Sequence, residues 1–62
     1  GSPYVYGNNF NNVRLKVYEA ATARVEKNTI NNLEFANPNK HNSTFINNTL
    51  SAAAQDALDA CN

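Results

Sequence analysis

Short stretches of apolar and polar residues predict a strand–helix–strand–helix order. Residues 3–6, Pro-Tyr-Val-Tyr, are aromatic and β-branched, which is typical of a short strand, and the Gly-Asn-Asn of residues 7–9 predicts a turn. Residues 29–30 and 33–36 predict a second strand. It should end at Pro38, because proline removes a backbone donor from a sheet.

Residues 13–27 support two interpretations. Val13, Leu15 and Val17 alternate with polar residues, as in a half-buried strand. Val13, Val17 and Val25 also share one face of a helix, for which Asn12 is a good N-cap. This segment lacks Gly and Pro and is long for a strand, so we expect a helix. The alternative is that residues 13–19 form a strand leading into it.

The clearest element is a helix over residues 52–60, for which Ser51 is the expected N-cap. One side of this helix is mostly alanine, so it can pack closely against another element while burying little area. Phe45-Ile46, upstream of it, is too short an apolar segment to classify, and no internal repeat is apparent. The apolar stripe consists of Leu50, Ala53, Ala54, Ala57, Leu58 and Cys61.

This order predicts an α+β fold, a small α/β-sandwich of split βαβ type with two helices packed on a sheet. Two short strands are too few for a stable sheet, and a chain of 62 residues rarely builds a sufficient core alone. We therefore expect residues 1–62 to be a single incomplete domain, whose sheet is completed by a second chain.

Charge and composition narrow the function. Five Lys/Arg balance five Asp/Glu, and this neutrality argues against binding to nucleic acid or to an anionic membrane surface. Thirteen asparagines indicate either a base-composition bias with a loop-rich structure, or a polar, hydrogen-bonding surface suited to a secreted protein. The chain begins without Met and without a signal peptide, so we expect a processed product or one with added residues.

Cys61, the single cysteine, cannot form an internal disulfide. It lies at the edge of the alanine stripe, where it is either a buried thiol or the site of a disulfide to a second chain or to further sequence of the same protein. Ala54, Ala57, Leu58 and Cys61 are accordingly the candidate partner interface. No catalytic, cofactor-binding or metal-ligating motif is evident, so we expect a protein that is not an enzyme and needs no cofactor.

The remaining candidates are surface features. Asn42 and Asn47 begin N-x-Ser/Thr sequons, which favour a secreted, glycosylated protein, although such triplets also arise by chance here. His41, the only histidine, is interpreted as a solvated loop residue. Asp56 and Asp59 lie on one outer side of the last helix, where they form either a solvated face or a crowded pair near the negative helix end. If Asp59 also met a carboxylate of a partner, assembly would be favoured at low pH.

The aromatic residues near the N-terminus also have two interpretations. Tyr4, Tyr6 and Phe10 either contribute to the core or form a platform for a sugar or a hydrophobic target.

Taken as a whole, the chain resembles the smaller (alpha) subunit of the salt-mediated yeast killer toxins. The resemblance rests on the start Ser-Pro-Tyr-Val-Tyr-Gly-Asn-Asn-Phe at residues 2–10, the length, the Asn richness and the absent initiator Met. It implies a secreted heterodimer cut from one precursor, with an α/β-sandwich fold. It also implies killing of competing yeast through damage to the plasma membrane, and stability only in acid.

A weaker resemblance is to the inhibitory propeptides of papain-family cysteine proteases. Arg24, the Asn-Leu-Glu-Phe of residues 32–35 and Asn42 follow their helical spacing approximately. Ala36 stands where those propeptides have Ile, and Pro38 would interrupt their long helix. A third possibility is a non-catalytic interaction fragment of a secreted protein.

Overall fold

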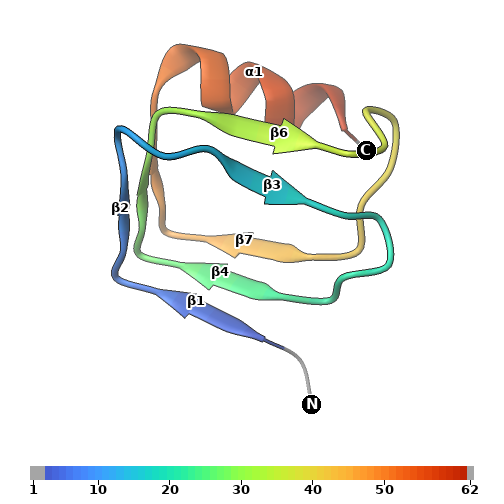
Figure 1. Cartoon of the computed structure of the whole chain (residues 1–62), viewed down its shortest axis with the longest axis horizontal. Coiled ribbons are helices and arrows are strands. Elements are labelled where there is room, and N and C mark those ends of the chain that lie inside the picture. The colour runs from blue at the N-terminus through green and yellow to red at the C-terminus, as the bar shows by residue number, and fades with distance from the viewer. Residues whose placement is uncertain (1–2, 62) are drawn as a thin grey trace.

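The computed structural model describes residues 3–61 and shows a chain wound into a coil whose successive turns we call rungs (Figure 1). The first rung covers residues 4–23, the second covers residues 24–43, and the third begins at residue 44. The strands are β1 (Tyr4–Tyr6), β2 (Asn9–Phe10), β3 (Leu15–Val17), β4 (Arg24–Glu26), β5 (Thr29–Ile30), β6 (Leu33–Phe35), β7 (Thr44–Ile46) and β8 (Thr49–Leu50), followed by the helix α1 (Ala52–Ala60).

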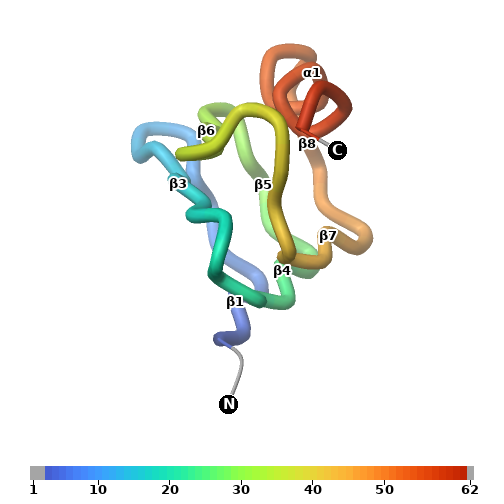
Figure 2. Tube along the Cα trace, turned by 90° about the vertical axis from the view of Figure 1, so that its right-hand side faces the viewer, coloured from blue at the N-terminus to red at the C-terminus, as the bar shows by residue number. Residues whose placement is uncertain are grey.

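Equivalent strands of successive rungs lie side by side and form three small parallel sheets. Their strand orders are β1-β4-β7, β2-β5-β8 and β3-β6. In the first sheet Val5 is opposite Val25, and Val25 is opposite Phe45. The rungs follow one another from blue to orange across the molecule (Figure 2). This arrangement is a short parallel β-solenoid, in which each rung contacts its neighbours.

Side chains that point into the coil stack on those of the next rung and form the core. The second rung is the most deeply buried, because it lies between two others: Val25 is 1% exposed and Ile30 is 0% exposed. Burial of such aliphatic side chains contributes about 1.5–3 kcal/mol each before entropy is counted. The buried apolar residues are Val17, Val25, Ile30, Leu33, Phe35, Ala54 and Cys61.

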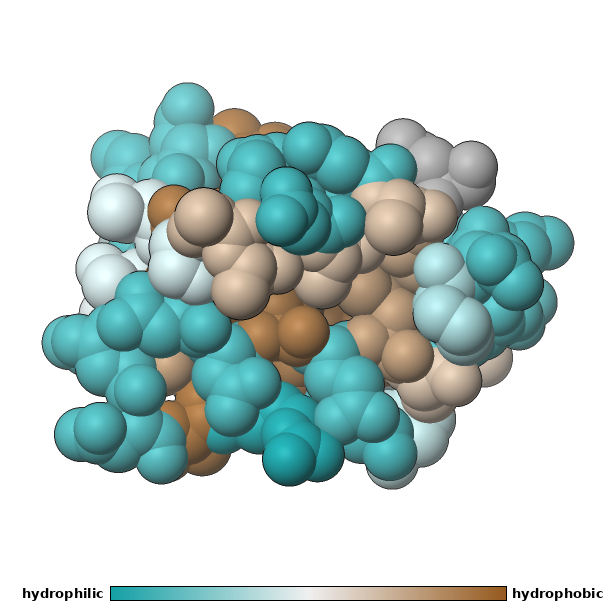
Figure 3. All heavy atoms as spheres, turned by 90° about the horizontal axis from the view of Figure 1, so that it is seen from above, coloured by the Kyte–Doolittle hydropathy of each residue, from teal (hydrophilic) through white to brown (hydrophobic). Residues whose placement is uncertain are grey.

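The predicted helix over residues 52–60 is confirmed, as is its N-cap. The Ser51 hydroxyl accepts a hydrogen bond from the Ala54 N–H at 3.1 Å. α1 packs against β6 and β8, and so stands where a third strand would otherwise extend the β3-β6 sheet. Seen from the α1 side, hydrophobic atoms form a band between hydrophilic side chains (Figure 3).

The predicted helix over residues 13–27 is wrong. The segment contains β3 and β4, joined by a turn over residues 18–23. The alternation of Leu15 and Val17 with polar neighbours is the pattern that the fold uses, because these two side chains stack on Leu33 and Phe35 of the next rung. Stacking between rungs therefore outweighs the helical propensity of the alanine-rich turn.

The two-helix α/β-sandwich is also not what the chain forms; the α+β class holds, with one helix and three parallel sheets in the described residues. The second strand expected at residues 29–36 is two strands, β5 and β6, which belong to different sheets. Phe45-Ile46 lies in β7. Each sheet is assembled from strands of this one chain, so the shortage of strands that suggested a partner does not arise within residues 3–61.

One corner repeats in every rung. Gly7, Lys27 and Asn47 follow β1, β4 and β7 respectively, and all three have left-handed backbone, with φ of 69°, 57° and 53°. Glycine adopts this conformation without steric cost, asparagine tolerates it and lysine is strained. The stacking of the rungs therefore imposes left-handed backbone at this corner, even on Lys27, whose side chain disfavours it.

We predict that Lys27→Gly stabilises the protein by about 0.5–1 kcal/mol, the relief of left-handed strain less the entropy that glycine adds to the unfolded chain. Asn47→Gly should gain less. Lys27→Ala is the control, because it removes the contact of Lys27 with the Tyr6 ring but keeps the strain. Urea unfolding measures the difference, and a Lys27→Gly variant no more stable than Lys27→Ala would contradict it.

Candidate functional site

The most connected polar feature is a ladder of asparagines, Asn8, Asn28 and Asn48, placed twenty residues apart directly after the left-handed corner. The Asn8 N–H donates to Asn28 Oδ1 at 2.8 Å, and the Asn28 N–H donates to Asn48 Oδ1 at 2.9 Å. Each rung is thereby tied to the next through one side chain.

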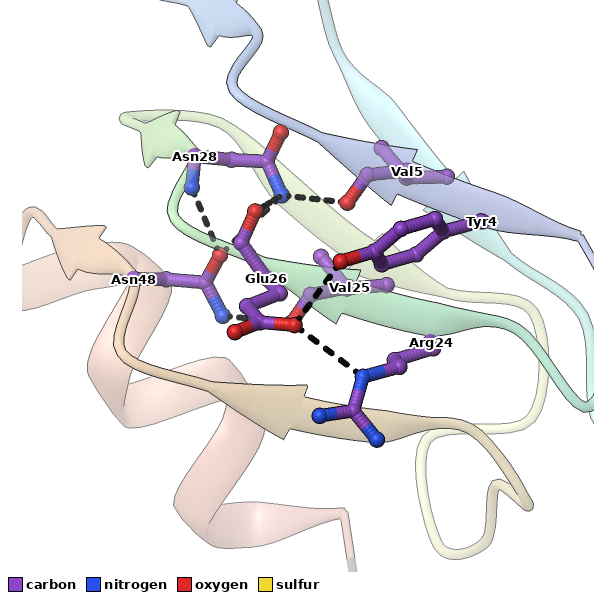
Figure 4. A network of polar contacts seen from close by, with 7 residues as sticks. All are labelled: Tyr4, Val5, Arg24, Val25, Glu26, Asn28 and Asn48. Carbon is purple, nitrogen blue, oxygen red and sulfur yellow. Dashed lines mark hydrogen bonds and ion pairs between the residues drawn. The ribbon is translucent and has the colours of Figure 1, made fainter.

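The amide nitrogens of the ladder donate to the same preceding rung from which the amide oxygens accept. Asn28 Nδ2 donates to the Val5 carbonyl oxygen at 2.9 Å, and Asn48 Nδ2 donates to the Val25 carbonyl oxygen at 2.9 Å (Figure 4). Asn28 is 1% exposed, yet every buried side-chain nitrogen and oxygen in the described residues has a hydrogen-bond partner. A buried amide is tolerated because its bonds are complete.

Outside the coil, a second polar cluster crosses β1 and β4. Arg24 Nε and the Tyr4 hydroxyl both donate to Glu26 Oε1, each at 3.0 Å (Figure 4). These bonds, that of Arg24 first, hold the pKa of the Glu26 carboxyl below its usual range. The Glu26 side chain is 16% exposed, against 55% for Arg24, so the carboxylate lies beneath the side chains that bind it.

Two of the three predicted platform aromatics lie on this outer face. Tyr4 and Tyr6 are 59% and 49% exposed, and their ring centroids are 5.5 Å apart. The core interpretation is therefore wrong for both tyrosines. Phe10, which points into the coil, is half-buried against the core. The three residues thus do not form one platform, although the tyrosine pair remains exposed.

The residues predicted as a partner interface face this chain's own strands. Ala54 and Cys61 are fully buried, while Ala57 and Leu58 are half-buried against the core. Cys61 is a free thiol whose Sγ contacts the Asn37 carbonyl oxygen at 3.3 Å. Within this chain the thiol is 0% exposed, and the expectation of a disulfide to a second chain stays a prediction.

The expected surface features lie apart from one another. Asn42 and Asn47 are both exposed, and Asn42 Nδ2 donates to the Glu19 carbonyl oxygen at 2.7 Å. Asp56 and Asp59 lie on the outer side of α1, where Asp59 accepts a hydrogen bond from Gln55 at 2.9 Å. The structure therefore does not join these residues into one site.

His41 is not the solvated loop residue that was expected. Its ring is half-buried and lies 4.8 Å from the Phe35 ring and 5.6 Å from the Phe45 ring, measured between centroids. Its Nδ1 accepts a hydrogen bond from the Ser43 N–H at 3.2 Å. His41 thus covers the side of the core at the corner where the second rung passes into the third.

Residues 3–61 show no pocket and no group of three or more His, Cys, Asp or Glu side chains placed to hold a metal ion. Within the same range, no helix has both the length and the apolar character needed to cross a membrane. The chemistry that the described residues do offer is hydrogen bonding along stacked strands. No protein-family model, curated protein or solved structure matches the chain.

We predict that Asn28→Ala costs about 2 kcal/mol or more, because it leaves the Asn8 N–H and the Val5 carbonyl without their partners. Asn48→Ala should cost less, since Asn48 is only half-buried. Asn8→Ala, at an exposed position, is the matched control and should stay within about 0.5 kcal/mol. Urea unfolding should give this order, and equal losses at the three positions would contradict the ladder's role.

A second prediction follows from the lowered pKa of Glu26. A carboxyl with a lower pKa in the folded than in the unfolded chain stabilises above its unfolded pKa of about 4.3 and loses this contribution as the pH falls. The urea midpoint should therefore fall less between pH 7 and pH 2 in Glu26→Gln than in the wild type. Asp56→Asn, on the exposed side of α1, controls for the loss of one negative charge. Identical pH profiles for the wild type and Glu26→Gln would contradict this assignment.

Proposed function

We propose that this chain is a non-catalytic end module of a parallel β-solenoid, in which α1 closes the stack and the rungs carry the contacts to other protein surfaces. The observation that carries the proposal is the place of α1, which takes the position of a third strand beside β6. Stacked-repeat proteins need a terminal unit with a polar outer side, because an uncovered rung exposes apolar side chains and backbone groups.

The two sides of α1 fit this role. Ala54 and Cys61 face the core and are buried, and small side chains let the helix lie close to β6. Gln55, Asp56 and Asp59 point to solvent. The helix therefore covers apolar residues on one side and presents amide and carboxylate groups on the other.

An extracellular location is part of the proposal. It is supported by the exposure of both sequon asparagines, Asn42 and Asn47, and by a surface rich in uncharged polar side chains. The proposal is therefore nearest to the third of the classes considered from the sequence, an interaction fragment of a secreted protein. A partner chain would then contact the outside or the open end of the coil.

The killer-toxin subunit remains an alternative proposal with less support. An α/β-sandwich with two helices differs from three parallel sheets and one helix. The hydrogen bonds of Glu26 favour the folded chain at higher pH, opposite to stability confined to acid. The propeptide alternative requires a long helix where residues 24–35 form β4, β5 and β6.

The closing role of α1 is tested by two neighbouring substitutions. Ala54→Glu places a carboxylate on the buried side of α1, whereas Ala53→Glu places it on the exposed side. We expect Ala54→Glu to displace the helix, raise binding of a hydrophobic dye and produce larger species in sedimentation, because the apolar ends of the rungs are uncovered.

Ala53→Glu should behave as the wild type in the same measurements. Leu58→Ala, a milder change on the half-buried side, should give an intermediate result if Ala54→Glu prevents folding altogether. Equal sedimentation and equal dye binding of the Ala54→Glu and Ala53→Glu variants would contradict the proposed function.

A further inference from the structure

The end of the coil opposite α1 consists of β1, β2 and β3, each of which is the first strand of its sheet. Along the described chain, the bonds that join one rung to the next repeat. The Thr44 N–H donates to the Ala23 carbonyl at 2.9 Å, and one rung earlier the Arg24 N–H donates to the Pro3 carbonyl at 2.9 Å. The next equivalent donor in this series is the Tyr4 N–H, for which the described residues hold no equivalent acceptor.

The bonds at the second strand of each rung, and those of the asparagine ladder, repeat from rung to rung in the same way. The Thr49 N–H donates to the Asn28 carbonyl and the Thr29 N–H donates to the Asn8 carbonyl, so the next donor in line is the Asn9 N–H. Asn28 and Asn48 each accept an N–H from the preceding rung, and the next acceptor is Asn8 Oδ1. Among the described residues, none donates to it.

The amide nitrogen of Asn8 shows the same incompleteness. Asn28 Nδ2 donates both to the Glu26 carbonyl within its own rung and to the Val5 carbonyl of the preceding rung. Asn8 Nδ2 makes the bond within its own rung, to the Tyr6 carbonyl at 3.2 Å. For Asn8 Nδ2, the described residues hold no carbonyl equivalent to that of Val5, to which Asn28 Nδ2 donates in the preceding rung.

Apolar side chains at this end are incompletely covered as well. Val5, Phe10 and Leu15 point into the coil but are only half-buried. Their equivalents one rung later are Val25, Ile30 and Leu33, which are 1%, 0% and 8% exposed. The difference is due to position, because the second rung is covered on both sides and the first on one.

We infer that the face formed by β1, β2 and β3 binds a further parallel rung with the twenty-residue spacing of the described ones. This inference rests on the proposed solenoid end module. A rung with the twenty-residue spacing would supply a backbone N–H to Asn8 Oδ1 and carbonyl oxygens to the Tyr4 and Asn9 N–H groups, and would cover the three apolar side chains.

A second copy of this chain is a poorer occupant. Its opposite end carries α1, and a helix about 10 Å across is twice as thick as the spacing of about 4.8 Å between strands, so it obstructs a strand-by-strand stack. Two copies joined through their β1 faces by a two-fold axis would run their strands antiparallel. That arrangement abandons the ladder register.

The test places a copy of residues 24–43 directly before Tyr4, so that the new junction imitates that of Ser43 with Thr44. We expect amide hydrogen exchange at Tyr4 and Asn9 to slow by about tenfold relative to the unfused chain, and the urea midpoint to rise. Two controls are a fusion with a scrambled copy, and the intact fusion with Asn8→Ala, which removes the side chain that would accept the N–H of the added rung. The first should give no gain and the second a smaller one.

Unchanged exchange at Tyr4 and Asn9, or a fused chain that unfolds, would overturn the inference. Concentration-dependent protection of these amides in the unfused chain would overturn it as well, in favour of a second copy. The Ala54→Glu and Ala53→Glu comparison reports on the other end of the coil. Failure of the rung to stack can therefore be distinguished from failure of the closing role of α1.

Discussion

The buried amide of Asn28 is the interaction on which the remainder of the structure depends. Its oxygen accepts a backbone N–H from the first rung, its nitrogen reaches back to the carbonyl of Val5, and its own N–H is bound by Asn48. These bonds specify which residue of one rung lies over which residue of the next. The inward side chains stack in register only because this alignment is set, since a shift of one residue in a strand would turn each of them outward.

The coil has two unlike ends, and this asymmetry is its main structural feature. At one end, α1 replaces a strand and covers apolar residues with alanines. At the other end, the hydrogen-bonding pattern of the sheets runs up to β1, β2 and β3, the outermost described strands. A module with one covered and one extendable end is suited to terminate a stack, since rungs interact mainly with their nearest neighbours.

Local features are predictable from the sequence, whereas the repeat leaves only a weak signal in it. The α1 bounds and its Ser51 N-cap follow from composition, and β1 follows from its aromatic and β-branched residues. The sequence carries one sign of the repeat, which is a valine three residues before an asparagine, at Val5 with Asn8 and again at Val25 with Asn28. It is obscured because the third rung has Phe45 at that place and because Leu15 pairs with Leu33, two residues short of the twenty-residue spacing. With the repeat obscured, helix propensity favours a helix over residues 13–27, where the chain forms β3 and β4.

The corners of the coil differ in what they permit. The corner at Gly7, Lys27 and Asn47 has the same length and the same left-handed backbone in every rung, because the ladder asparagine follows it directly. The corner after the third strand covers residues 18–23 in one rung and residues 36–43 in the next, and the sheets stay aligned across this difference. The corner between the second and third strands also differs, with residues 11–14 in one rung and residues 31–32 in the next, so two corners absorb differences in length while the alignment of the strands is kept. These two corners are thus free to diversify in shape, whereas the left-handed corner is not.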